Sequence, residues 1–252
     1  MTQPIERVFV IHVSEGYEDR RKHIDSHLPE AGITKFEYML DGDIKDLTDK
    51  ITEKLFKGGS LSPAEQSCFY KHYLVYKKIV EEKIPQCLVL EDDVSVVKDF
   101  CNKLEQVVDE LKTKENYLVN IEGAYLSVPF KFRKKGQYTY LANYTKMTGG
   151  YIIDFFAAKK IYEYLNQNPA SLPIDTYQSD MRDEIEFNIY WSQPSLVEQG
   201  SKNGTFASGI NGEGDSLSDK IKYLLKNYHK KYIFSHINKR VSRVFEDVAF
   251  YK

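Results

Sequence analysis

Three consecutive acidic side chains, Glu91, Asp92 and Asp93, follow directly after the apolar run Cys87–Leu90. Such a run predicts a buried β-strand, and carboxylates bunched at its end repel one another unless something positive lies beside them. Hard divalent cations such as Mg²⁺ and Mn²⁺ bind one or two carboxylates together with substrate phosphates. The triplet therefore predicts a site for a metal ion and a diphosphate at the carboxyl end of a strand. A solvated acidic turn is the alternative, and the triplet alone leaves both open.

Strands and helices alternate on both sides of this triplet. Apolar runs predict strands at 7–13, 35–39, 86–90 and 117–121, with helices at about 18–31, 62–82 and 98–112 between them. The helix at 62–82 has the clearest start, because Ser62 and Glu65 form a capping box and Pro63 occupies the first helical position. This alternation is typical of α/β folds, in which ligands bind beyond the carboxyl ends of the strands.

The second half of the chain is less regular. We expect short strands within 138–144, a helix at 155–165 capped by Asp154, and a strand at 186–191. Residues 169–180 are predicted to form a loop that holds Asp175 and Asp180. The stretch 200–215 is rich in Gly, Ser and Asn and is predicted to be mobile.

Composition limits the class of protein. The chain has 252 residues, of which 42% are hydrophobic, so it can bury a sizeable core. Three cysteines without a CxxC pair argue against a disulfide framework and a cysteine-rich zinc site, and they fit a reducing compartment. The first residues lack an apolar leader, and no run approaches the roughly 20 apolar residues of a membrane span. We therefore expect a cytoplasmic protein.

The charge is distributed unevenly and suggests two parts, a main domain over 1–215 and a tail over 216–252. The tail carries nine Lys or Arg against three acids, whereas the whole chain has a net charge of −2. Leu217, Ile221, Leu224 and Leu225 recur at helical spacing, which predicts a basic amphipathic helix. Such a helix can lie on an anionic membrane surface, here the inner face of a membrane, or its apolar face can pack on the main domain. A nucleic-acid partner is not expected, because the rest of the chain is acidic.

Several motifs occur in an order that resembles a known family. They are Asp41-Gly42, the capped helix with Cys68 and His72, the acidic triplet, Thr148-Gly-Gly-Tyr151, Pro173-Ile-Asp175 and Pro194-Ser-Leu-Val-Glu-Gln199. Together, over roughly residues 5–210, they resemble glycosyltransferase family 25. The resemblance implies an α/β, GT-A-like (Rossmann-like) nucleotide-sugar-binding fold with a mixed central sheet. It departs from the family at Lys71 and Gly209, where the family pattern has Ser and Asp.

The resemblance also implies an activity, which is an inverting, metal-dependent transfer of a hexose from a UDP-sugar to a glycan. Galactose is the expected sugar, and a lipid-linked lipopolysaccharide or lipooligosaccharide is the expected acceptor. Mn²⁺ or Mg²⁺ would bind Glu91 and Asp93, and Asp175 would be the catalytic base. The residues assigned to donor binding are Val13, Arg20, Arg21, Asp41, Gly42, Asp92, Gly149, Gly150, Glu198 and Gln199.

Other interpretations stay open at this point. Asp175 can instead cap a turn, Asp180 is a second candidate base, and His72 is expected to be a packed core histidine. One alternative function is a degenerate relative that binds a glycan or nucleotide sugar without turnover. Another is a metal-dependent phosphodiesterase or nucleotidyltransferase, which commonly needs a second acidic cluster, here Asp180 and Asp183.

Overall fold

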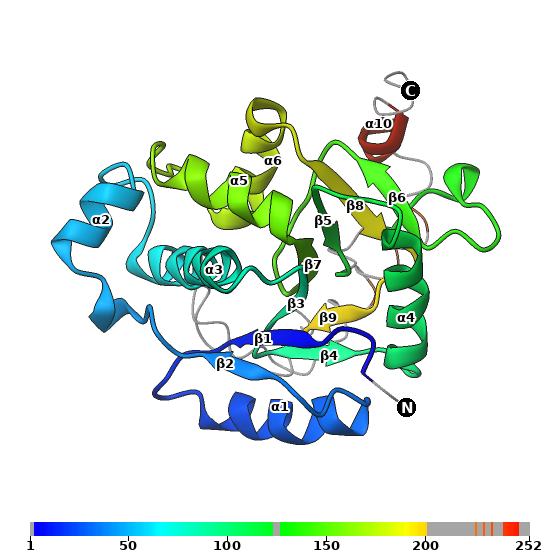
Figure 1. Ribbon diagram of the computed structural model, residues 1–252, viewed down its shortest axis with the longest axis horizontal. Helices are drawn as coiled ribbons and strands as arrows, with labels where there is room; N and C mark the ends of the chain where they lie inside the picture. The colour runs from blue at the N-terminus through cyan, green and yellow to red at the C-terminus, as the bar shows by residue number, and fades with distance from the viewer. Residues whose placement is uncertain are drawn as a thin grey trace.

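The computed structural model describes residues 3–122, 127–200, 225, 229, 233 and 239–246. At its centre lies a seven-stranded mixed sheet in the order β2-β1-β3-β7-β5-β8-β6 (Figure 1). The strands are β1 (Arg7–Ile11), β2 (Glu37–Met39), β3 (Gln86–Glu91), β5 (Tyr117–Asn120), β6 (Thr139–Ala142), β7 (Gly150–Asp154) and β8 (Asn188–Ser192). β6 and β7 run antiparallel to their neighbours, whereas β1 is parallel to both β2 and β3. The predicted α/β fold with a mixed sheet is confirmed.

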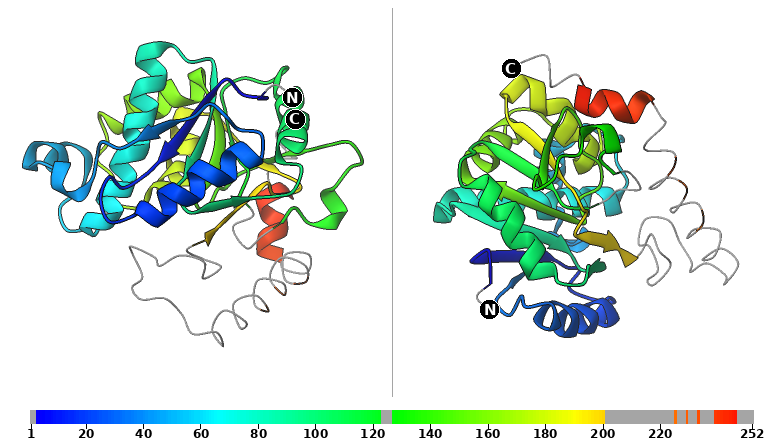
Figure 2. Two further views of the ribbon diagram at one scale, coloured as in Figure 1. Left: turned by 90° about the horizontal axis from the view of Figure 1, so that it is seen from below. Right: turned by 90° about the vertical axis from the view of Figure 1, so that its right-hand side faces the viewer.

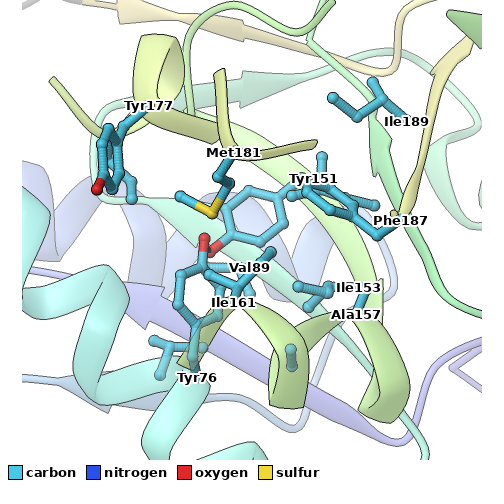
Figure 3. Close-up of a cluster of buried hydrophobic side chains, with 14 of the residues drawn as sticks. Tyr76, Val89, Tyr151, Ile153, Ala157, Ile161, Tyr177, Met181, Phe187 and Ile189 are labelled. Carbon is cyan, nitrogen blue, oxygen red and sulfur yellow. Dashed lines mark hydrogen bonds between the residues drawn. The ribbon is translucent and has the colours of Figure 1, made fainter. Parts of the chain in front are cut away.

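Helices cover both faces of this sheet, which makes three layers (Figures 1 and 2). Helices α3 (Pro63–Glu82), α5 (Phe155–Leu165) and α6 (Ile174–Ile185) cover one face, and α1 (Glu18–Glu30) and α4 (Phe100–Leu111) cover the other. The strands supply both cores by alternation, since Phe9 packs under α3 whereas Val8 and Val10 pack under α1. Figure 3 shows part of the first core, where Tyr76, Tyr151 and Met181 meet beside α5.

Two helix starts follow their predicted chemistry. The backbone N–H of Glu65 donates to Ser62 Oγ at 3.4 Å, and the backbone N–H of Ser62 donates to Glu65 Oε2 at 2.9 Å. These reciprocal bonds complete the capping box of α3. Asp154 accepts the backbone N–H of Ala157 at 2.9 Å and caps α5.

Two expectations about the second half were wrong. Residues 169–180 are not all loop, because α6 begins at Ile174 and places Asp175 in its first turn. The segment Gly150–Asp154 is strand β7, for which no strand had been predicted. Smaller elements complete the structure: a two-stranded ribbon of β4 (Val94–Val96) and β9 (Val197–Gln199), η1 (Ile44–Asp46), α2 (Asp49–Leu55) and η2 (Phe130–Phe132).

The basic tail is described mainly at α10 (Lys239–Glu246), which lies beside β6 (Figure 1). Val241 and Phe245 are buried there, and the ring of Phe245 lies 5.9 Å from that of Trp191, centroid to centroid. Most of the tail, including the helix expected around 217–225 and the boundary near 215, lies outside the described residues, as does the stretch 201–215. Among the described helices, none combines the length and apolar character needed to cross a membrane.

Candidate functional site

A cavity of about 400 Å³ opens at the carboxyl ends of β1 and β3, beside the start of α3. In an open α/β sheet this edge is the usual place for a ligand. Five segments meet there: the end of β1 with the start of α1, the start of η1, the first half of α3, the acidic triplet, and the end of β9. The lining residues are Ile11, His12, Val13, Glu15, Tyr17, Arg20, Asp43, Ile44, Lys45, Ala64, Ser67, Cys68, Lys71, Glu91, Asp92, Asp93 and Gln199.

Asp92 is held by two side chains at the cavity wall. His12 Nδ1 lies 2.6 Å from Asp92 Oδ2, and Arg20 Nη1 donates to Asp92 Oδ1 at 2.8 Å. The guanidinium of Arg20 also lies over the ring of Tyr17, 4.7 Å from its centroid. The contacts with Asp92 and Tyr17 both restrict the side chain of Arg20, so its positive charge is held at one side of the cavity.

Glu91 and Asp93 bring two further carboxylates to the cavity. Thr148 Oγ1 donates to Glu91 Oε1 at 2.7 Å, and Gln199 Nε2 donates to Glu91 Oε2 at 2.8 Å. Asp93 is buried, and its main-chain oxygen accepts the backbone N–H of Gly200 at 2.6 Å. The pairing of β4 with β9 explains why Gln199 reaches Glu91, since Gln199 is opposite Val94 in the ribbon.

A buried ion pair lies at the opposite wall. Lys71 Nζ is 2.8 Å from Asp43 Oδ1, and both side chains are almost fully buried. Ser14 donates to the same carboxylate through its backbone N–H and its hydroxyl. Burial alone would raise the pKa of Asp43, but the bonds from Lys71 and Ser14 outweigh it and lower that pKa below its ordinary value. Asp43 is therefore an anion bound to Lys71 at neutral pH.

The pKa of the Cys68 thiol reflects the negative charge of the carboxylates around it. Burial raises the pKa of Cys68 well above its usual value, and the charges of Glu91, Asp175, Asp93 and Asp92 raise it further. Asp175 therefore acts on the same thiol as the acidic triplet, although it comes from α6. The region accumulates negative charge that favours a bound cation.

Six of the residues assigned to the site from the sequence line this cavity: Val13, Arg20, Glu91, Asp92, Asp93 and Gln199. The others are not among its described lining residues. Arg21 is exposed and lies over the ring of Tyr38, 4.8 Å from its centroid. Asp41 and Glu198 are exposed, and buried Gly42 accepts a hydrogen bond from Ser67 through its carbonyl.

The glycine pair packs against the chain itself. A Cβ on Gly149 would lie 2.6 Å from both Gln199 Cγ and Glu122 Oε2, and one on Gly150 would lie 2.6 Å from Val197 Cγ2. Side chains of β9 and Glu122 thus occupy the space that larger residues would need. Here the absence of side chains lets the β4–β9 ribbon approach the central sheet.

Asp175 is positioned by backbone donors. Its Oδ2 accepts the N–H of Met147 at 2.9 Å and its Oδ1 accepts the N–H of Thr176 at 2.7 Å. Asp180, the other candidate base, is exposed. Asp183 is exposed as well and pairs with Arg182 at 3.1 Å. Neither Asp180 nor Asp183 is among the described residues that line the cavity.

Sequence reasoning did not assign His12, Tyr17, Asp43 or Lys71 to the site. Two of them carried a usable signal, because His12 interrupts the first apolar run just before Val13 and Asp43 follows the Asp-Gly turn. Lys71 had been noted only as a departure from the family pattern. Its pairing with Asp43 depends on how α3 packs beside η1, which local sequence does not reveal.

Comparison with known proteins places the chain in a family. Residues 6–178 match the family model "Glycosyltransferase family 25 (LPS biosynthesis protein)". Because this match covers more than half of the chain, the protein belongs to glycosyltransferase family 25. The resemblance noted in the sequence is confirmed.

The curated relatives differ in what their names report. The chain is 28% identical to human procollagen galactosyltransferase 2 over 145 residues, 54% of this chain and 23% of that protein. It is 25% identical over 121 residues to lipooligosaccharide biosynthesis protein lic2B of Haemophilus influenzae, 45% of this chain and 44% of that protein. It is also 25% identical over 173 residues to a Bos taurus protein named probable inactive glycosyltransferase 25 family member 3, 65% of this chain and 29% of that one. The matched segments thus span less than half of these relatives.

Among solved structures, a glycosyltransferase involved in glycosylation of the major capsid of PBCV-1 is similar at 10% identity, with a TM-score of 0.43. The alignment covers 86% of this chain and 98% of that one.

Proposed function

We propose that this chain is an active, inverting glycosyltransferase that transfers a hexose, most simply galactose, from a UDP-sugar to a hydroxyl of a glycan. The observation that carries the proposal is the cavity at the carboxyl ends of β1 and β3, where Arg20 and the acidic triplet meet. Membership of the family supplies the reaction class, and the names of the procollagen galactosyltransferases and lic2B support the sugar and a surface-glycan acceptor.

The cavity offers suitable partners for a nucleoside diphosphate. A guanidinium can pair with phosphate oxygens, and Arg20 is held at the wall by Asp92 and Tyr17. The ring of Tyr17 can also stack against a base or ribose. Val13 follows β1 at the same edge and would contact the donor through its backbone. In this proposal Arg20 and Tyr17 orient the diphosphate and nucleoside.

The residues also fit a hard divalent cation such as Mn²⁺ or Mg²⁺. Carboxylate oxygens are the ligands that such ions prefer, and Glu91 and Asp93 both line the cavity. Asp92 differs from Glu91 in its partners, because Asp92 contacts His12 and the guanidinium of Arg20, whereas Glu91 accepts from the neutral side chains of Thr148 and Gln199. When bound at Asp93, with Glu91 assisting, the ion would offset the negative charge of the departing UDP.

The base would act on the acceptor. Inverting transfer forms a bond from an acceptor oxygen to the anomeric carbon while the bond to the diphosphate breaks on the opposite side. The acceptor hydroxyl must lose its proton, and the carboxylate of Asp175 is our candidate to take it. Its two backbone hydrogen bonds fix its position, and its charge acts on Cys68, which lines the cavity, although Asp175 itself is not among the described lining residues.

The decisive experiment compares wild type with Asp93→Asn for sugar transfer and for UDP-sugar hydrolysis without acceptor. If Asp93 holds the cation, the variant should lose nearly all activity while it keeps its fold by circular dichroism, because it loses a charge in a position that binds metal. Asp183→Asn, an exposed acid on α6, is the matched control and should keep full activity. Wild-type activity in Asp93→Asn, or full activity in excess EDTA, would overturn the metal assignment.

The degenerate alternative is tested by the same assays. Some relatives carry the word inactive in their names, so binding without turnover is a real outcome. A wild-type chain that is stabilised by UDP-sugar and Mn²⁺ yet neither transfers nor hydrolyses the sugar would be such a relative. A nucleotidyltransferase is less well supported, because Asp180 and Asp183 do not join the acidic triplet.

A lipid-linked acceptor and contact between residues 216–252 and an anionic membrane stay proposals. They are supported by the basic composition of the tail and tested by co-sedimentation with anionic liposomes over a salt series. If the protein does not bind anionic liposomes at low salt, the membrane contact is refuted. One part of the tail, α10, packs on the domain through Phe245 and Trp191.

A further inference from the structure

Cys68, His72 and Glu91 bring a thiol, an imidazole and a carboxylate together behind the cavity. Cys68 and His72 are four residues apart on α3, so they lie on the same face of the helix. That face is directed at the end of β3, and one potential ligand atom from each residue lies within 4.8 Å of the others. Cys68 and Glu91 also line the cavity, and Glu91 is shared with the oxygen-ligand site proposed at Asp93, whereas His72 is not among the described lining residues.

His72 provides the second observation. Its side chain is fully buried, and its Nε2 has no hydrogen-bond partner among the residues that the structure describes. Glu91 Oε1 lies 3.5 Å from this nitrogen. The other ring nitrogen, Nδ1, lies 2.9 Å from the hydroxyl of Tyr151, which donates in turn to Tyr76 at 3.3 Å. Figure 3 shows the hydroxyl groups of these two tyrosines close to each other.

The hydrogen bonds of Tyr151 decide which ring nitrogen of His72 carries a proton. If Tyr151 donates to Tyr76, then His72 Nδ1 must carry the proton and donate to Tyr151, since a hydroxyl has one hydrogen. In the neutral imidazole, His72 Nε2 then presents a lone pair toward the carboxylate of Glu91. A nitrogen lone pair and a carboxylate oxygen that face each other at 3.5 Å repel, and a cation between them removes the repulsion.

We propose that Cys68, His72 and Glu91 form a binding site for a borderline-soft divalent metal ion such as Zn²⁺, distinct from the oxygen-ligand site at Asp93. A thiolate, an imidazole and a carboxylate are zinc ligands, whereas Mg²⁺ and Mn²⁺ favour oxygen alone. Zinc–ligand distances of about 2.0–2.3 Å require the three atoms to approach by only about an ångström, which side-chain rotation can supply. The thiol would release its proton on binding.

The surroundings of the cluster match those of a metal site. Ligating histidines commonly donate their second N–H to an oxygen, and Tyr151 is placed to accept it. Glu91 is oriented by Thr148 and Gln199, each through one carboxylate oxygen. Because Cys68 and Glu91 both line the cavity, the fourth coordination position would face it. Three protein ligands with one position toward a cavity is the arrangement of zinc sites that bind a small ligand.

The experiment uses the full chain without an affinity tag, stripped of metal and titrated with Co²⁺ as a spectroscopic substitute for Zn²⁺. We expect one equivalent to bind, with an intense near-ultraviolet band from thiolate-to-cobalt charge transfer, and we expect one equivalent of Zn²⁺ to abolish that band. Cys68→Ser should lose the band and weaken binding at least tenfold. Cys101→Ser makes the same chemical change outside the cluster and should leave the titration unchanged.

Two more variants separate this site from the proposed reaction. His72→Gln should weaken Co²⁺ binding while keeping the thiolate band at saturation, provided circular dichroism shows a folded chain. Asp93→Asn should keep the band and its affinity, whatever happens to sugar transfer. The proposal is overturned if wild type shows no thiolate band, if Cys68→Ser binds Co²⁺ as wild type does, or if Asp93→Asn abolishes the band. Failure of the sugar-transfer assay alone would not affect it.

Discussion

At the scale of single residues, two carboxylates of the cavity are held in ion pairs by the chain itself, whereas Glu91 accepts hydrogen bonds from neutral side chains. Asp92 is bound to His12 and Arg20, and Asp43 is bound to Lys71. Buried pairs of this kind contribute little net stability, but breaking one leaves a charge without compensation. The two kinds of carboxylate should therefore respond differently to substitution.

Asp175→Asn tests the proposed base. We expect turnover to fall by roughly 10²–10⁴-fold, the usual contribution of a general base. The affinity for the UDP-sugar should hardly change, because the base contacts the acceptor hydroxyl. Steady-state kinetics together with donor titration by calorimetry would separate the two quantities.

Asp180→Asn is the matched control, since Asp180 lies on the same helix and is exposed. It should behave as wild type. A larger loss in Asp180→Asn than in Asp175→Asn would reassign the base, and a collapse of donor affinity in Asp175→Asn would place that residue at the donor.

Lys71→Met should make stability depend on pH in a new way. In wild type the pKa of Asp43 is lowered on folding, so its contribution is present above the unfolded pKa near 4 and is lost as pH falls through the folded value. Without Lys71, burial dominates and Asp43 is destabilising as an anion. We expect the variant to lose about 3 kcal/mol at pH 7.

This deficit should shrink as pH falls through the carboxylate range, because protonation of Asp43 removes the uncompensated charge. Urea unfolding between pH 3 and pH 7 would measure it. The double variant Asp43→Asn, Lys71→Met should recover part of the loss at pH 7. A deficit that is equal at every pH would show that Lys71 acts through packing alone.

At the scale of elements, α3 contributes most of one wall of the cavity. Ala64, Ser67, Cys68 and Lys71 all come from its first three turns. The capping box fixes the residue at which α3 begins, and therefore which of its side chains face the cavity. Ser62, which caps the helix, is exposed and is not among the described residues that line the cavity.

Ser62→Ala should lower the free energy of unfolding by about 1 kcal/mol, because the N–H of Glu65 loses its side-chain acceptor. Ser60→Ala, two residues earlier in an exposed turn, should change it by less than about 0.5 kcal/mol. Urea denaturation of both variants measures the difference. Equal effects would show that the capping box does not stabilise α3.

The helices and strands that could be predicted from the sequence were those whose signals lie within a few neighbouring residues. The Ser62–Glu65 capping box predicted the start of α3, the Asp154 cap predicted the start of α5, and the apolar run before Glu91 predicted strand β3. All three predictions were confirmed. Asp175 was placed in a loop over residues 169–180, yet proline is also common at the start of a helix, and α6 begins directly after Pro173. The contacts of Lys71 with Asp43 and of Gln199 with Glu91 join residues far apart in sequence, so they could not be read from local patterns.

At the scale of the whole molecule, α10 joins the tail to the central sheet. Phe245 packs against Trp191 and Phe132, and the backbone N–H of Asn143 donates to the carbonyl of Val244 at 3.0 Å. These contacts connect the last described helix to the edge of the sheet at β6. The tail is thus partly integrated with the domain that carries the site.

Phe245→Ala should lower the free energy of unfolding of the domain by about 3 kcal/mol, since it removes a buried ring. Arg243→Ala changes an exposed residue of the same helix and should have little effect. Chemical denaturation followed by tryptophan fluorescence is suitable, because Trp191 is the single tryptophan. A loss below about 1 kcal/mol would mean that α10 does not pack this way in solution.

The order of strands has a practical consequence for anyone who shortens the chain. The family match ends at residue 178, but β8 lies between β5 and β6 in the sheet. A protein cut at 178 would keep β5 and β6 but lose the strand that joins them, so both would present unpaired backbone edges. Exposed edges of this kind recruit strands from other copies and lead to aggregation. The unit that can be expressed alone should therefore extend beyond the segment that defines the family.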